Sequence, residues 1–162
     1  MPEVICNTSP LQYLHQLALL DLLPNLVGRV TIPGAVVAEL DAGRKYGVNL
    51  PDLSRLDWVD ICHPASEQVL PLVVDLGPGE TEVLALALER RNAIVVLDDS
   101  LARQVAQTLR IQFTGTLGVL LSAKHSGLIP AIAPRLDQLQ ELRFRLAPAT
   151  RVAVLKLAGE PS

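Results

Sequence analysis

The chain has few aromatic residues, few cysteines and no long apolar run. Phe, Tyr and Trp make up 3% of it, and the two cysteines are Cys6 and Cys62. Neither cysteine lies in a CxxC or Cys/His spacing, which argues against a zinc site and predicts two reduced, buried thiols. The longest uncharged stretch, residues 4–20, is broken by polar residues and Pro10, so it does not have the composition of a membrane span.

The first residues lack the basic segment that opens a secretory signal. We therefore expect a cytoplasmic protein that does not interact with a membrane. The 162 residues include 19% charged residues, 12 Pro and 10 Gly. This composition excludes disordered, collagen-like and coiled-coil chains. The length fits one domain over residues 1–162, with a C-terminal helical extension at about 130–162.

The two halves of the chain carry opposite charge. Residues 1–89 hold 4 basic and 12 acidic side chains, whereas residues 90–162 hold 10 basic and 5 acidic side chains. If both halves fold together, an acidic region can face a basic one. This arrangement suits the binding of cations beside polyanionic phosphates, although mutual neutralisation of solvated surfaces explains it equally well.

Short apolar runs alternate with segments of helical periodicity. The pattern predicts strands at 4–6, 30–32, 58–61, 94–97 and 111–114. It predicts helices at 10–20, from 34 to about 40, and at 80–88, 101–109, 117–124, 134–142 and 149–158. Ser9 has the form of an N-cap, residues 41–54 are typical of a surface loop, and residues 64–75 are ambiguous. Strands that alternate with helices indicate an α/β fold with a mainly parallel sheet.

Polar residues follow the predicted strands. Ligands of parallel sheets bind beyond the carboxyl ends of the strands, where we expect Asn7, Asp98 and Thr116 to lie. Four further carboxylates are candidates at this edge: Glu39, Glu80, Glu82 and Asp99. Each candidate also has a structural explanation. Asp99 is a typical helix cap, Glu80 and Glu82 suit the first turn of a helix, and Glu39 can be a solvated helix residue.

Three carboxylates in one pocket would repel one another, by up to about 4 kcal/mol for a pair at ~4 Å. A divalent cation would offset this repulsion, and an all-oxygen ligand set favours Mg²⁺ or Mn²⁺ over zinc. Such ions polarise phosphoryl oxygens and activate water for phosphodiester hydrolysis. We therefore predict that Glu39, Glu80 and Asp98 meet in one negatively charged pocket. The three histidines have no Ser or Cys partner in a catalytic spacing.

Five ordered motifs resemble one protein family. They are Asn7-Thr8-Ser9-Pro10-Leu11, Ile32-Pro33 leading to Glu39-Leu40, Gly77-Pro78-Gly79-Glu80-Thr81-Glu82, Leu97-Asp98-Asp99-Ser100-Leu101-Ala102-Arg103, and Gly115-Thr116-Leu117-Gly118-Val119-Leu120. In this order they are similar to a prokaryotic branch of the PIN-like (PilT N-terminus) domains. The resemblance covers residues 3 to about 159. It implies a three-layer sandwich in which helices flank a central, mainly parallel sheet.

The resemblance also implies a metal-dependent endoribonuclease that acts on single-stranded RNA, often as the toxin of a toxin–antitoxin pair. The implied catalytic residues are Asn7, Glu39, Glu80 and Asp98, with Glu82 as the alternative to Glu80 and Asp99 as an adjacent metal ligand. Thr8, Ser9, Arg103, Thr116, Lys124, Arg143 and Arg145 would contact RNA. Asn7 departs from the Asp that most active members carry. A carboxamide oxygen still ligates a hard cation but brings no charge.

One alternative function and three partners follow from these observations. A catalytically silent PIN-like module that binds nucleic acid or protein would explain Asn7. The resemblance implies an antitoxin protein and a homodimer as partners, besides single-stranded RNA. The Leu-rich stretch at 11–23 would supply a dimer surface, but core packing explains it equally well.

Overall fold

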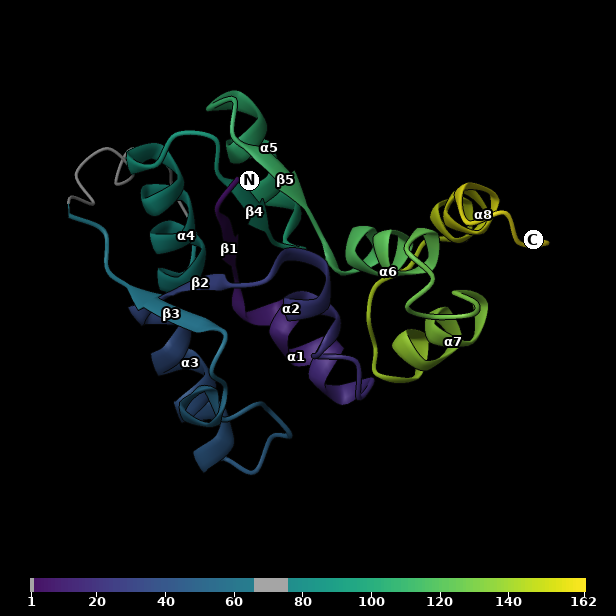
Figure 1. The fold of residues 1–162 in the computed structure, drawn as a ribbon, viewed down its shortest axis with the longest axis horizontal. Helices are drawn as coiled ribbons and strands as arrows, with labels where there is room; N and C mark the ends of the chain where they lie inside the picture. Colours follow the sequence, from purple (N-terminus) through teal and green to yellow (C-terminus); the bar gives the residue numbers. More distant parts are fainter. Residues whose placement is uncertain (1, 66–75) are drawn as a thin grey trace.

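The computed structural model describes residues 2–65 and 76–162. Its sheet consists of β1 (Val4–Cys6), β2 (Val30–Pro33), β3 (Val59–Cys62), β4 (Ile94–Val96) and β5 (Gln112–Thr114). The strands pair in the order β3-β2-β1-β4-β5, and every pair is parallel. Figure 1 shows β1 between β2 and β4. The predicted α/β three-layer fold is confirmed.

Eight α-helices and one short 3₁₀ turn, Leu53–Arg55, connect or follow the strands in the described residues. The helices are α1 (Thr8–Gln16), α2 (Leu22–Val27), α3 (Gly34–Lys45), α4 (Pro78–Glu89), α5 (Ser100–Thr108), α6 (Thr116–His125), α7 (Ala133–Glu141) and α8 (Pro148–Leu157). Apolar side chains at helical spacing fix α1 in the core, where Leu11 and Leu14 are fully buried.

The chain reverses its direction across the sheet after β3. Successive strands run outward from β1 to β3, and the next connection, through α4, returns to β4 beside β1. Right-handed crossovers therefore place α4 on the face opposite the helices that connect β1 to β2. The helix α4 packs on β1, β2 and β4, α2 packs on β2, and α6 packs on β5. The strand order thus changes direction between β1 and β4, where ligands of such sheets bind.

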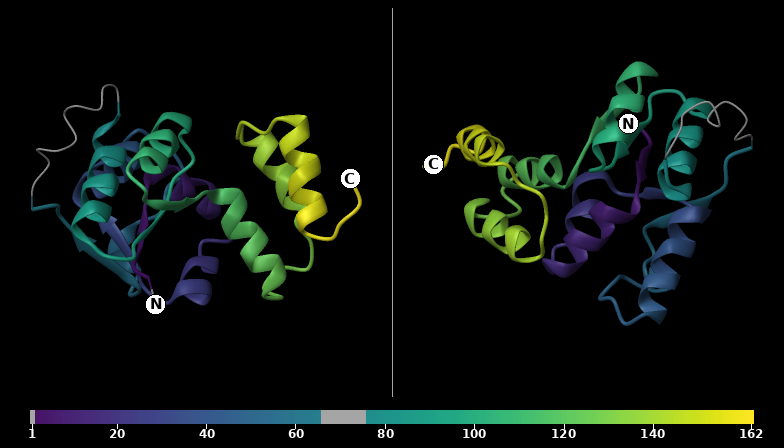
Figure 2. Two further views of the ribbon diagram at one scale, coloured as in Figure 1. Left: turned by 90° about the horizontal axis from the view of Figure 1, so that it is seen from above. Right: turned by 180° about the vertical axis from the view of Figure 1, so that it is seen from behind.

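The last helices form a group at one end of the molecule. Figures 1 and 2 show α6, α7 and α8 close together beside the sheet, with the C-terminus at the outer end of this group. The Glu160 carboxylate accepts hydrogen bonds from the N–H groups of Ile132 (2.7 Å) and Ala133 (3.1 Å) at the start of α7, and from Lys124 Nζ (3.0 Å) on α6. One hydrophobic cluster runs from Val4 in β1 to Ala158 beyond α8.

Several element boundaries differ from the prediction. Asn7, and not Ser9, is the N-cap residue of α1, because the helix already begins at Thr8. The predicted loop at 41–54 begins later, since α3 continues to Lys45. The helix α2 was not predicted. The ambiguous segment 64–75 lies mostly outside the described residues.

Two composition-based predictions can be compared with the structure. Both cysteines are free, and Cys6 is buried as predicted, but Cys62 is only partly buried because β3 is an edge strand. Within residues 2–65 and 76–162, no helix combines the length and the apolar composition that crossing a bilayer requires.

Candidate functional site at the carboxyl edge of the sheet

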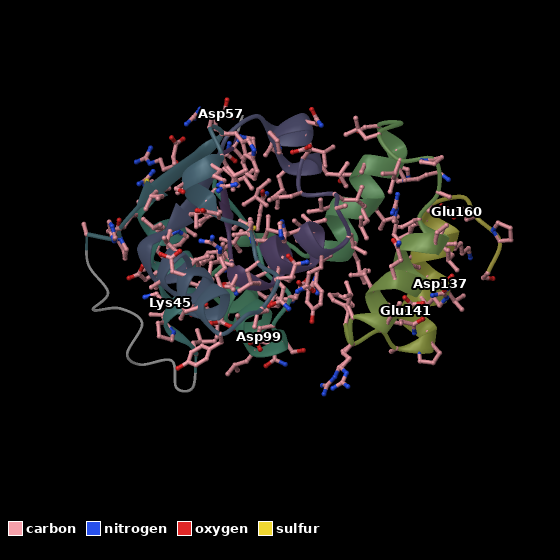
Figure 3. The ribbon with its side chains drawn as sticks, turned by 90° about the horizontal axis from the view of Figure 1, so that it is seen from below. Lys45, Asp57, Asp99, Asp137, Glu141 and Glu160 are labelled. Atoms are coloured by element: carbon pink, nitrogen blue, oxygen red, sulfur yellow. The ribbon has the colours of Figure 1, made fainter. Side chains whose placement is uncertain are left out.

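Three strand ends meet at the carboxyl edge of the sheet. Asn7 directly follows β1, and its N–H donates to the carbonyl of Val96 at the end of β4 (2.9 Å). The N–H of Leu97 donates to the carbonyl of Thr114 at the end of β5 (2.9 Å). Figure 3 shows the amino and carboxyl ends of the strands on opposite sides of the view. Asp57 marks the amino end, just before β3, and Asp99 marks the carboxyl end, just after β4.

Glu39 and Asn7 come together at the start of α4. The Glu39 carboxylate accepts hydrogen bonds from the Thr8 hydroxyl and from the N–H of Gly79 (3.0 Å). A Cβ atom on Gly79 would lie 2.8 Å from both Glu39 oxygens and 3.0 Å from Asn7 Oδ1. Because Gly79 has no side chain, the two polar side chains can approach the helix backbone closely.

Asn7 leaves one polar atom unsatisfied. The residue is 3% exposed, and among the buried side-chain atoms of the described residues its Oδ1 is the one without a hydrogen-bond partner. A buried acceptor without a partner costs about 1–3 kcal/mol. Such an atom therefore calls for a ligand that donates a proton or carries positive charge.

Asp98 is held by the first residue of α6. Its Oδ1 accepts from the Thr116 N–H (2.8 Å), and its Oδ2 accepts from the Thr116 hydroxyl (2.7 Å). Burial raises the pKa of Asp98 above its ordinary value, more than the two hydrogen bonds and the positive charge of Arg103 lower it. The ionised form is thus under-stabilised by the protein alone, and a cation at this position would favour it.

Two predicted metal ligands serve as helix caps instead. Glu82 Oε1 accepts from the N–H of Ala35 (2.8 Å) in the first turn of α3. Asp99 is the N-cap of α5, where its Oδ2 accepts from the N–H of Ala102 (2.9 Å). Both carboxylates satisfy helix N–H groups that would otherwise lack acceptors. We therefore leave Glu82 and Asp99 out of the candidate ligand set.

The predicted pocket of three carboxylates is not found. No three His, Cys, Asp or Glu side chains in the described residues are placed to hold a metal ion together. Glu80 folds back toward Gly77 at the start of α4, while Glu39 and Asp98 bond to Gly79 and Thr116. The prediction overlooked two donors that are distant in sequence, Gly79 and Thr116, which hold oxygens of Glu39 and Asp98 at the starts of α4 and α6.

A mixed set of oxygen ligands nevertheless fits a hard cation. The orphaned Oδ1 of Asn7 lies beside the Glu39 carboxylate, and the strand pairing of β1 with β4 brings Asn7 next to the segment that carries Asp98. Amide and carboxylate oxygens are the ligands that Mg²⁺ and Mn²⁺ prefer. The observed set therefore suits such an ion with Asn7 as one ligand.

The residues predicted to contact RNA lie in different environments. Thr8 bonds to Glu39, Thr116 bonds to Asp98, and Ser9 lies partly buried in the first turn of α1. Lys124 is paired with Glu160 inside the C-terminal helices, with 23% of its side chain exposed. The guanidinium of Arg103 lies 4.9 Å from the centre of the Phe113 ring. Arg143 and Arg145 are exposed on either side of Phe144.

Sequence reasoning missed four residues at this edge: Gly79, Tyr13, Phe113 and Phe144. Gly79 contributes through its backbone N–H, which a sequence pattern does not reveal. Burial first and the negative charge of Asp98 second raise the pKa of the Tyr13 hydroxyl. The sequence offered one signal for the three aromatic residues. Aromatic residues make up only 3% of the chain, so contacts between them are unexpected by chance.

Comparison with known proteins identifies one family. A family model described as a PIN domain matches residues 3–160. A search of curated proteins finds no match.

Proposed function

Because the chain belongs to the PIN domain family, whose fold is of the nuclease type, we propose that it is a metal-dependent endoribonuclease that cleaves single-stranded RNA. The observation that carries the proposal is the buried, unpartnered Oδ1 of Asn7 beside the Glu39 carboxylate. A divalent cation would give this oxygen a partner and would offset the charge of the two nearby carboxylates. The opposite charges of the two halves of the chain support a polyanionic substrate.

The chain's own residues have distinct tasks in this proposal. Asn7, Glu39 and Asp98 would hold Mg²⁺ or Mn²⁺, which supplies Lewis-acid activation of the phosphodiester and of water. Thr8 orients Glu39, and Thr116 fixes both oxygens of Asp98, so that neither carboxylate must reorganise when the ion binds. Glu80, partly exposed in the first turn of α4 with its carboxylate near Gly77, is the candidate to accept a proton from the attacking water.

A cleavage assay with matched variants tests this proposal. Wild type should cleave a dye-labelled single-stranded RNA in Mn²⁺ and should stop when EDTA is added. Glu39→Gln and Asp98→Asn each remove a charge without changing size, and we expect each to lower the rate by about 100-fold or more. Asp41→Asn, on the same helix as Glu39 but exposed, should cleave like wild type. Equal rates in all four proteins would reject the proposal.

The second candidate is a catalytically silent PIN-like module that binds nucleic acid or protein. It is favoured by Asn7, which brings no charge, and by the lack of three grouped carboxylates in the described residues. Asn7→Asp separates the two candidates. If wild type is inactive and only Asn7→Asp cleaves RNA, the module is silent. If wild type is active, the amide oxygen suffices as a ligand.

The toxin role implied by the family resemblance belongs to the same proposal, with an antitoxin protein as its partner. Induced expression of wild type in a bacterial host should arrest growth, because cleavage of single-stranded RNA stops protein synthesis. Asp98→Asn at the same protein level should leave growth unchanged. Growth arrest by both proteins would show that any toxicity does not come from this site.

A further inference from the structure

Two aromatic contacts involve elements near the segment that carries Asp98: one begins on α1, and the other joins α5 to β5. The chain holds only two Phe, two Tyr and one Trp, and three of these five rings take part in the two contacts. Such a concentration of rings beside a candidate phosphate site is characteristic of proteins that bind single-stranded nucleic acid.

The first contact joins α1 to the segment between α7 and α8. The rings of Tyr13 and Phe144 lie edge to face, with centroids 5.0 Å apart and planes at 87°. This geometry fixes the plane of the Tyr13 ring. Tyr13 is partly buried on α1, and α1 packs on α6, whose first residue Thr116 bonds to Asp98. A fixed aromatic ring therefore lies on the α1 side of the candidate site.

The second contact borders the same site on the α5 side. The Arg103 guanidinium lies 4.9 Å from the centroid of Phe113, whose strand neighbour Thr114 is bonded to Leu97 just before Asp98. A cation over an aromatic face is held in place by the ring, while its N–H groups at the edge stay available for phosphate oxygens. The Arg103 charge also acts on Asp98, whose pKa it lowers.

Three arginines of this region are free of carboxylate partners in the described residues, as are Arg91, Arg110 and Arg135 elsewhere. Arg29, Arg90 and Arg151 each form an ion pair with a carboxylate. In the part of the chain that the structure describes, Arg103, Arg143 and Arg145 form no such pair, although Arg143 and Arg145 flank Phe144 directly. Their positive charge is therefore available to an anionic ligand.

We propose that Tyr13, held by Phe144, and Arg103, held by Phe113, form a clamp for one single-stranded stretch of RNA beside Asp98. Tyr13 stacks on an unpaired base, and Arg103, Arg143 and Arg145 contact the adjoining phosphates. This inference rests on the proposed function for the identity of the ligand. The clamp selects single strands, because a base in a duplex is already stacked on both sides and cannot reach the Tyr13 ring.

Binding without cleavage tests the clamp separately from the nuclease. Fluorescence anisotropy in EDTA measures the affinity of the full chain for a labelled single-stranded 12-mer and for the same 12-mer in a duplex. We expect Tyr13→Leu to weaken single-strand binding about tenfold and Tyr13→Phe to stay within about twofold of wild type. Tyr46→Leu is the matched control, because Tyr46 is 88% exposed and lies at the end of α3. Arg103→Gln should make the salt dependence of log Kd shallower by about 0.7.

A second measurement keeps the test independent of changes in folding. Trp58, the single tryptophan, is 8% exposed, so in Tyr13→Trp a new indole reports directly on stacking. Its fluorescence should be quenched by the single strand and not by the duplex. No quenching, equal binding of duplex and single strand, or equal binding by Tyr13→Leu and Tyr46→Leu would each overturn the clamp. Tight single-strand binding that depends on Tyr13, without cleavage in Mn²⁺, would reject the nuclease and keep the clamp.

Discussion

Gly79 is the residue on which the approach of Glu39 and Asn7 depends. Its N–H donates to Glu39, and the space that its missing side chain leaves is occupied by oxygens of both residues. In Gly79→Ala, the added methyl group would come too close to three oxygens at 2.8–3.0 Å. The Glu39 carboxylate would move, because it is the flexible end of a long side chain.

We predict that Gly79→Ala folds but loses activity. Alanine is favoured over glycine by at most about 1 kcal/mol at this position in the first turn of α4, which offsets part of the local crowding, so thermal unfolding should change little. The displaced Glu39 should lower the rate of RNA cleavage by roughly 10- to 100-fold, as displacements near 1 Å do at other active sites. Circular dichroism melts and cleavage rates check both statements. A variant as active as wild type would show that the position of Glu39 does not matter.

Asp98 combines a candidate catalytic role with a cost in stability. Its pKa is raised by burial in the folded protein. Folding is therefore unaffected while Asp98 is protonated in both the folded and the unfolded state. As the pH rises above the ordinary, unfolded-state pKa, the unfolded chain ionises first and is favoured, and the cost is complete above the higher folded-state pKa.

Asp98→Asn should therefore be more stable than wild type at pH 7, although inactive. Asparagine keeps an acceptor for the Thr116 N–H, and the Thr116 hydroxyl can accept from its amide. We expect a melting temperature higher by roughly 2–4 °C, the shift that about 1 kcal/mol produces in a domain of this size. Melts between pH 3 and pH 8 should show the difference vanish at low pH. A difference that grows toward acid would contradict this assignment.

At the scale of the elements, two carboxylates cap helices that lie far from them in the sequence. Glu82 of α4 accepts from the first turn of α3, and Glu160, beyond α8, accepts from the first turn of α7. Neither α3 nor α7 receives a cap from its own N-cap side chain. These long-range caps tie neighbouring helices together, so the loss of one carboxylate affects two elements.

Glu160→Ala tests the strength of such a tie. The Glu160 side chain is 10% exposed and bonds to Ile132, Ala133 and Lys124. Its removal should destabilise the chain by about 1–2 kcal/mol, typical of a lost helix cap. Chemical denaturation measures this loss. Glu141→Ala, exposed on α7 itself, is the control and should stay within about 0.5 kcal/mol of wild type.

The donors that surround the Glu160 carboxylate make its contribution to stability depend on pH. Partial burial alone would raise the pKa of Glu160, but the two N–H groups and the Lys124 ammonium together lower it. The stabilisation by Glu160 is therefore present above its unfolded-state pKa and is lost as the pH falls through the folded-state value. The hydrogen-exchange protection factors of the α7 amides, which are corrected for the intrinsic pH dependence of exchange, should fall in wild type as acid protonates Glu160, and Glu160→Ala should lack this acid step.

Regular elements could be predicted because their signals are local. The strand predicted at 94–97 is observed at Ile94–Val96, and the helix predicted at 134–142 is observed at Ala133–Glu141. Both predictions rest on the periodicity of apolar residues within the element and on the turn residues that flank it. The helix α2 escaped prediction because its six residues, with Pro24 inside, are too few for a periodicity to stand out.

The candidate site could be predicted only in part, because its contacts are not local. The motifs placed Asn7, Asp98 and Thr116 correctly at strand ends, since a parallel sheet gathers such residues at one edge. They did not reveal that Glu82 would cap α3, 47 residues away in sequence, or that Phe144 would reach Tyr13. A carboxylate in a first turn has the same pattern whether it binds a cation or a neighbouring helix.

At the scale of the whole molecule, the candidate site joins the two oppositely charged halves of the chain. Asn7 and Glu39 come from residues 1–89, whereas Asp98, Thr116 and Arg103 come from residues 90–162. A cation held by Asn7, Glu39 and Asp98 would therefore link segments from both halves. Any ligand that binds only the folded chain adds to its stability in proportion to the logarithm of ligand concentration.

We therefore predict that Mn²⁺ raises the melting temperature of the wild type. At 100 times its Kd, the ion should contribute about 2.7 kcal/mol, or roughly 5–10 °C for a domain of this size. Asn7→Ala and Glu39→Gln should shift less at the same Mn²⁺ concentration. Asn7→Asp should shift more, because it adds a charge to the ligand set.

Differential scanning calorimetry with and without Mn²⁺ measures these shifts. Asp41→Asn is the control, since Asp41 is an exposed carboxylate on the helix that carries Glu39, and it should behave like wild type. An equal shift in wild type and in a double variant with Glu39→Gln and Asp98→Asn would place the ion elsewhere. No shift in wild type combined with a shift in Asn7→Asp would mean that the amide oxygen holds the ion too weakly, and would favour the silent module over the nuclease.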